Sequence, residues 1–217
     1  DKHIASRLAI VRTHKGETHG IFHGDKLITP FHTFKNACGN DTLTVQSLRG
    51  LYDYGILSRQ KMEQVPKQDI MVLVNPIDVT PFKQSQIFRP PIQCEVAYMI
   101  VCRRTPNGLR FEKTQETEIF PLGKQYGGVW KHGCDTRLGD CGGPIIACRD
   151  RKIVGFNGGR LMQMKYNTVL AHIFEPVNET FIEMLAKMEY AKGFWKFNPE
   201  LVEWSRLLPT TTSFPIQ

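Results

Sequence analysis

The feature that most constrains this chain is a glycine-rich turn, Gly-Asp-Cys-Gly-Gly-Pro at residues 139–144, which leads directly into an apolar stretch. A nucleophile in acyl transfer needs a sharp turn that presents its side chain, and backbone N–H groups aimed at the developing oxyanion. Glycine supplies the required dihedral angles and leaves room for a substrate. The turn therefore predicts that Cys141 is a nucleophile and that the N–H groups of Gly139, Asp140 and Cys141 form an oxyanion hole.

The alternative for this turn is a buried structural cysteine. Trypsin-like enzymes carry the same six residues with serine in place of cysteine, and the match over all six favours the nucleophile. A thiol nucleophile needs a base within reach, and His32, just past the end of a predicted strand, is the predicted base. His132 is the alternative, but it lies only nine residues before Cys141 and is interpreted as a packed structural histidine. Four more histidines are expected to face solvent: His3, His14, His19 and His23.

A carboxylate between the base and the nucleophile would orient the histidine. Asp69 directly precedes the apolar run at residues 70–74, which is typical of a buried strand. The order His, Asp, nucleophile is that of chymotrypsin-like enzymes, whereas papain-like enzymes place the cysteine first. Asp69 is therefore the predicted third member. Asp53 and Asp78 are weaker candidates because neither precedes a strongly apolar strand.

The rest of the chain is predicted to be mostly β. Hairpin turns are indicated at residues 23–25 and at Asn107-Gly108. Short strands separated by turn signals are typical of sandwiches or barrels. These strands are predicted at residues 42–48, 70–74, 95–102, 110–119, 144–148, 153–157 and 166–174.

The catalytic order and the strand pattern together predict an all-β, chymotrypsin-like fold of two barrels with the active site between them. We expect residues 1–80 to form the barrel with His32 and Asp69, residues 81–93 a connector, and residues 94–175 the barrel with Cys141. Residues 176–217 are expected to form a short helix and a tail. Asn178 would cap this helix and Gly193 would end it, with Phe181, Leu185 and Met188 on one face. Residues 210–213 are interpreted as flexible.

Composition limits the setting and the partners. The six cysteines are interpreted as reduced thiols, because the chain is long and shows no secretory signal. No apolar run is long enough to span a membrane, so no membrane partner is expected. No Cys-x-x-Cys pair occurs, and no metal or other cofactor is expected. A zinc site built from His132, Cys134, Cys141 and Cys148 is a minor alternative. The net charge of +7 predicts at most weak, salt-dependent binding to RNA.

Several segments besides the hexapeptide carry a family resemblance. They are Thr-Val-Gln-Ser-Leu-Arg-Gly at residues 44–50, Gln-Asp-Ile-Met at 68–71, Trp-Lys-His at 130–132, Ile-Val-Gly at 153–155 and the tail at 195–204. Through these the chain resembles, over nearly its whole length, the nuclear inclusion a proteases of potyvirus-family RNA viruses. The resemblance implies a viral cysteine endopeptidase that processes the viral polyprotein in cis and in trans. Its expected location is the host cytoplasm, with the nucleus as a second location. A catalytically inactive barrel that binds RNA or protein is the alternative.

The resemblance also implies a substrate pocket. In this family a threonine ahead of the nucleophile and a histidine after Val-Gly-x recognise the glutamine side chain before the cut. Thr136 matches the threonine. Here Asn157 stands at that second position, and an acidic residue expected near Leu138 is missing. Asn157 can still donate to an amide oxygen, so cleavage after Gln is predicted. The family's tail helps to cover the substrate cleft, which places Val202 and Trp204 beside the substrate.

Overall fold

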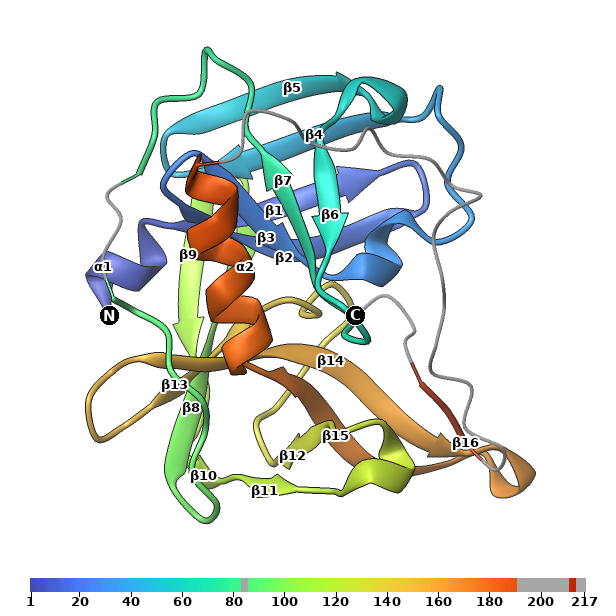
Figure 1. Cartoon of the computed structure of the whole chain (residues 1–217). Coiled ribbons are helices and arrows are strands. Elements are labelled where there is room, and N and C mark those ends of the chain that lie inside the picture. The colour runs from blue at the N-terminus through green and yellow to red at the C-terminus, as the bar shows by residue number, and fades with distance from the viewer. Residues whose placement is uncertain (83–85, 191–210, 214–217) are drawn as a thin grey trace.

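The computed structural model describes residues 1–82, 86–190 and 211–213. Two antiparallel sheets form the body of the structure (Figure 1), one above the other in this view, with a helix in front. The all-β, chymotrypsin-like architecture predicted from the sequence is confirmed.

The first sheet has seven strands in the order β5-β4-β1-β2-β3-β7-β6. Every neighbouring pair is antiparallel, and the β2–β3 hairpin turns at residues 24–25, as the sequence predicts. The elements of this part are α1 (Lys2–Ala5), β1 (Leu8–Thr13), β2 (Gly16–His23), β3 (Lys26–Thr29), the 3₁₀ turn η1 (Phe31–Phe34), β4 (Thr42–Ser47), β5 (Gly50–Ile56), η2 (Leu57–Arg59), β6 (Met62–Gln64) and β7 (Met71–Val74).

The second sheet is built from later strands in the order β10-β8-β13-β14-β15-β12-β11, with β9 paired to β8 and β16 paired to β14. Its longest pairing is between β14 and β15. The predicted turn at Asn107-Gly108 joins β8 to β9. The elements are β8 (Val96–Thr105), β9 (Gly108–Lys113), β10 (Thr117–Glu118), β11 (Phe120–Pro121), η3 (Lys124–Tyr126), β12 (Trp130–His132), β13 (Pro144–Ala147), β14 (Ile153–Gln163), η4 (Met164–Tyr166), β15 (Thr168–Pro176), α2 (Glu179–Tyr190) and β16 (Thr211–Ser213).

Helix α2 covers the junction of the two sheets. Asn178 caps it, since its side chain accepts a hydrogen bond from the N–H of Phe181 at 2.8 Å. The apolar face predicted from Phe181, Leu185 and Met188 is buried in one cluster with residues of both sheets. Figure 1 shows α2 lying in front of both sheets. The helix therefore ties together the two halves of the molecule between which the nucleophile turn lies.

Several sequence predictions are wrong in detail. The strands at residues 8–13 and 50–56 were not predicted, and the segment 110–119 divides into β9 and β10. β14 runs to Gln163, beyond the predicted end at 157, because pairing with β15 continues. Thr211–Ser213 is not a flexible tail but strand β16, paired with the edge of β14. The predicted helix stop at Gly193 lies outside the described residues.

Among the residues that the structure describes, no helix is both long and apolar enough to cross a membrane.

Candidate active site

His32 and Asp69 form a buried pair at one end of the neighbouring strands β3 and β7. η1 follows β3 directly and carries His32, while Asp69 lies just before β7, the strand that pairs with β3. Asp69 Oδ2 lies 2.6 Å from His32 Nδ1, and its Oδ1 accepts the backbone N–H of His32 at 2.8 Å. Two bonds to one carboxylate fix both the position of the residue and the orientation of its ring.

The thiol of Cys141 lies beside this pair and interacts with the ring of His32 both by charge and by hydrogen bonding. Burial acts to lower the pKa of His32, but Asp69 and then Cys141 outweigh it and raise this pKa well above its ordinary value. The cationic form of the ring is therefore stabilised. The two other carboxylates considered from the sequence lie elsewhere: Asp53 accepts the N–H of Gly55, and Asp78 is exposed.

The loop that carries Cys141 is held by backbone bonds on every side. The carbonyl of Cys141 accepts the N–H of His19 at 2.7 Å, and the N–H of Gly142 reaches the Asn157 carbonyl at 2.7 Å. The N–H of Asp140 donates to the Arg137 carbonyl at 3.1 Å. This bond corrects the sequence assignment, since an N–H already used inside the loop is not available to an oxyanion. The N–H groups of Gly139 and Cys141 remain the predicted donors to the oxyanion.

Gly142 is required by the geometry of this loop. Its φ is +90°, and a Cβ atom there would lie 2.3 Å from the His19 carbonyl oxygen and 2.7 Å from Pro30 Cδ. Any side chain at this position would push the nucleophile loop away from the first sheet.

We expect Gly142→Ala to destabilise the protein more than Gly55→Ala. Gly55 has a similar φ of +83° with nothing near its missing Cβ, so both variants carry the backbone strain but only Gly142→Ala carries the clash. Overpacking of this kind costs about 1–3 kcal/mol in unfolding free energy. Urea unfolding of the two variants measures the difference, and equal midpoints would show that the loop can shift at no cost.

Two histidines expected in solvent are buried instead. His19 lies in β2 and bridges to the second sheet, with Nδ1 2.7 Å from the Gly139 carbonyl and Nε2 accepting the N–H of Cys102 at 2.8 Å. His23 packs edge-on against Phe88, and burial lowers its pKa to about 4. Sequence reasoning missed both because a polar residue in an alternating strand shows no sign of a second sheet that covers it. His3 and His14 are exposed, as predicted.

The predicted substrate residues divide into three groups. Thr136 is partly buried on the loop before Cys141, and its hydroxyl lies 3.3 Å from His172 Nδ1. Asn157 is 1% exposed, with Oδ1 2.9 Å from His132 Nε2 and Nδ2 donating to the Asp140 carbonyl at 3.2 Å. Its contact with a substrate stays a prediction. Val202 and Trp204 lie outside the described residues.

His172 is a candidate that sequence reasoning missed. It lies in β15, is half-buried, and pairs in register with His132 of β12. Burial lowers its pKa, so the ring is neutral at neutral pH. The sequence signal was present in the strand at residues 168–176, where His172 interrupts an apolar run. Only strand pairing brings it to Thr136.

Across the described segments, no three His, Cys, Asp or Glu side chains are grouped so that they could hold a metal ion. All six cysteines are free thiols.

Two sheets of this topology, with a buried His–Asp pair facing a cysteine on a glycine-rich loop, define a chymotrypsin-like protease. The comparisons with known proteins agree and are more specific. The chain belongs to peptidase family C4, whose family model matches residues 1–217.

Solved structures of similar chains support this membership. A catalytically inactive Tobacco Etch Virus protease in complex with substrate is 26% identical, with a TM-score of 0.76 over 91% of each chain. The catalytically active Tobacco Etch Virus protease with product is 27% identical, with a TM-score of 0.75 over 87% of this chain and 80% of that one. The tobacco vein mottling virus protease shares the fold, with a TM-score of 0.75 over 94% of this chain and 92% of that one, at 21% identity.

Curated relatives are viral genome polyproteins. That of Brome streak virus is 27% identical over 93% of this chain, and that of Triticum mosaic virus is 26% identical over 99% of it. The chain spans only 6% and 7% of the length of these two polyproteins.

Proposed function

We propose that this protein is a viral cysteine endopeptidase that processes a viral polyprotein, with Cys141 as nucleophile, His32 as base and Asp69 as the group that orients His32. The buried pair of His32 and Asp69, with the Cys141 thiol against the same ring, carries the proposal. Membership of family C4 and the matches to regions within viral polyproteins support it.

The proposed chemistry follows from the charges of these groups. His32 holds the proton of Cys141, and the thiolate attacks the peptide carbonyl carbon to form a carbon–sulfur bond. The N–H groups of Gly139 and Cys141 stabilise the oxyanion. His32 then gives its proton to the leaving amine as the carbon–nitrogen bond breaks. A water, deprotonated by His32, hydrolyses the thioester and restores the thiol.

We propose polyprotein sites as the substrate, cut both within the same chain and between chains. The support comes from the relatives, in which a segment matching this chain is a small part of one long polyprotein. Weak RNA binding and the host-cell location stay predictions from charge and resemblance. The alternative of an inactive barrel gains no support from the active-site geometry, which brings a base and a thiol together.

Cleavage after Gln is the finer part of the proposal. Thr136, on the loop before Cys141, and His172 of β15 lie together, and both can bond to an amide. When the Thr136 hydroxyl donates to Nδ1 of His172, the neutral ring carries its proton on Nε2, where it can donate to a glutamine oxygen. Asn157 supports this arrangement from behind by binding His132, the neighbour of His172 in β12.

We expect peptides ending in Phe-Pro-Ile-Gln before the cut to be cleaved at least about tenfold faster, in kcat/KM, than those with Leu in place of Gln. A site that hydrogen-bonds an amide discriminates strongly against residues that lack one. Thr136→Val and His172→Ala should each reduce this preference. His14→Ala, a change at an exposed histidine away from this site, is the matched control.

Equal cleavage of the Gln and Leu peptides by the wild-type protein would refute the Gln preference. It would leave the endopeptidase activity itself in place. Loss of the preference in Asn157→Ala but not in His172→Ala would assign the reading of the amide to Asn157.

A further inference from the structure

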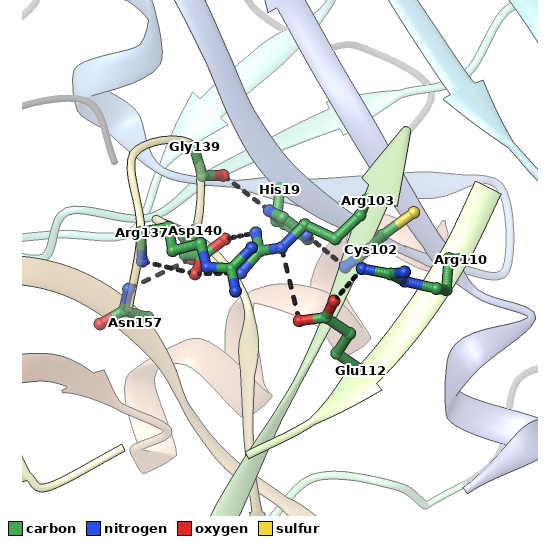
Figure 2. Close-up of polar contacts among 9 residues, drawn as sticks. All are labelled: His19, Cys102, Arg103, Arg110, Glu112, Arg137, Gly139, Asp140 and Asn157. Carbon is green, nitrogen blue, oxygen red and sulfur yellow. Dashed lines mark hydrogen bonds and ion pairs between the residues drawn. The ribbon is translucent and has the colours of Figure 1, made fainter. Parts of the chain in front are cut away.

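The residue before the proposed nucleophile has a fully buried carboxylate. Asp140 is 0% exposed, and both its oxygens are paired with the guanidinium of Arg103 from β8, one of them at 3.0 Å. Oδ2 also accepts the backbone N–H of Arg137 at 2.7 Å. Figure 2 shows Asp140 enclosed by these donors. A buried charge of this kind is stable only while its partners stay in place.

The partner is itself held in position. Arg103 Nε lies 3.7 Å from a carboxylate oxygen of Glu112 in β9, and Glu112 also binds the exposed Arg110. The bond to Asp140 and the charge of Asp140 raise the pKa of Arg103, so the cation is permanent. The ion pair therefore anchors the loop to the β8–β9 hairpin of the second sheet.

His19 holds the same loop from the first sheet. Because its Nε2 accepts the N–H of Cys102, the proton of the neutral ring is on Nδ1, which donates to the Gly139 carbonyl at 2.7 Å. Burial lowers the pKa of His19, which favours this neutral form. Figure 2 shows the ring between Gly139 and Cys102.

These contacts fix the peptide plane that carries the N–H of Cys141 and the plane that lies between this N–H and the N–H of Gly139. In a trans peptide the carbonyl and the N–H point in opposite directions, so holding one aims the other. The Asp140 carbonyl accepts Asn157 Nδ2 and the N–H of Gly143, which aims the N–H of Cys141 away from them. The preceding plane, which carries the Gly139 carbonyl and the Asp140 N–H and lies between the two oxyanion donors, is held at both ends. His19 binds the Gly139 carbonyl, and the Arg137 carbonyl accepts the N–H of Asp140.

We propose that Arg103 and His19 are positioning residues, which hold the loop at residues 137–143 so that the N–H groups of Gly139 and Cys141 face the oxyanion. Neither residue touches the reacting atoms. The proposal rests on the proposed protease function. We call the contacts of Arg103 and His19 with this loop the clamp. Weakening the clamp should impair the step in which an oxyanion forms, and should leave the reactivity of the thiol and the binding of substrate largely unchanged.

The test compares two reactions of the same thiol in the full chain. Alkylation of Cys141 by iodoacetamide needs a thiolate but no oxyanion hole, whereas peptide cleavage needs both. We expect Arg103→Leu to lower kcat for the Gln peptide on the order of 10²-fold, the loss seen when one oxyanion donor is removed. KM and the alkylation rate should stay within about threefold of wild type, the size of a minor change in binding.

Further variants keep the result interpretable. Arg103→Lys keeps a positive charge and should retain part of kcat. If Arg103→Leu alone fails to fold, Arg103→Leu combined with Asp140→Asn removes both charges of the pair. His19→Gln should act in the same direction as Arg103→Leu. Arg110→Gln, which alters the partner of Glu112 at an exposed position, is the matched control and should leave kcat unchanged.

The outcomes separate the two proposals. A wild-type protein that cleaves no peptide would refute the protease function. If the wild-type protein cleaves the peptide, and Arg103→Leu and the double variant cleave it equally well, only the positioning role is refuted. Equal losses of alkylation and cleavage would also refute it, because the clamp would then serve the thiol or the fold as a whole.

Discussion

Cys141→Ala is expected to abolish peptide cleavage, with a loss on the order of 10³-fold or more in kcat. Its thiol lies against the ring of His32 and helps to raise the pKa of that histidine. Since the nucleophile and its base act as a unit, removing the sulfur leaves only the contribution of substrate binding and the oxyanion hole. Cleavage of the Phe-Pro-Ile-Gln peptide measures the loss.

The matched control is Cys134→Ala. Cys134 is also buried, and burial raises the pKa of its thiol, so it should be unreactive and its removal should leave kcat unchanged. Far-ultraviolet circular dichroism and urea unfolding should show both variants folded. Substantial cleavage by Cys141→Ala would mean that another residue is the nucleophile.

Asp69→Asn is expected to reduce kcat on the order of 10²-fold while the protein stays folded. Both groups of His32 that face Asp69, its backbone N–H and its Nδ1–H, are donors in the present geometry. An amide has only one oxygen, so its NH₂ group must face one of these donors. The ring can relieve this conflict by moving its proton to Nε2, which then no longer accepts the proton of Cys141.

The loss should be smaller than for Cys141→Ala, because a thiol depends less on its base than a hydroxyl does. The iodoacetamide rate at neutral pH should fall as well, since the imidazolium that stabilises the thiolate is lost. Asp53→Asn is the control, as its side chain accepts a bond from Gly55 instead. Full activity of Asp69→Asn would show that another carboxylate holds His32.

Much of the fold was predictable from the sequence because its signals are local. The hairpin turns at residues 23–25 and 107–108 and the cap of α2 at Asn178 depend on residues within a few positions of one another. Strand ends were less predictable. β14 extends past residue 157 only because β15 continues to pair with it, and Thr211–Ser213 becomes a strand only because the edge of β14 is available.

The residue types of the nucleophile turn were enough to predict its chemistry, because only glycine tolerates the φ of +96° at residue 139 and of +90° at residue 142 without strain. The sequence by itself also determined the order of His32, Asp69 and Cys141 along the chain. The tertiary structure decided which groups meet. It buried His19 between the sheets, committed the N–H of Asp140 to Arg137, paired the Asp140 carboxylate with Arg103 and placed His172 beside Thr136. Each of these contacts joins segments whose separation is set by strand pairing or by the closure of a loop. The energy of a buried polar group depends on such partners, and these partners cannot be predicted from the residue types near it in the chain.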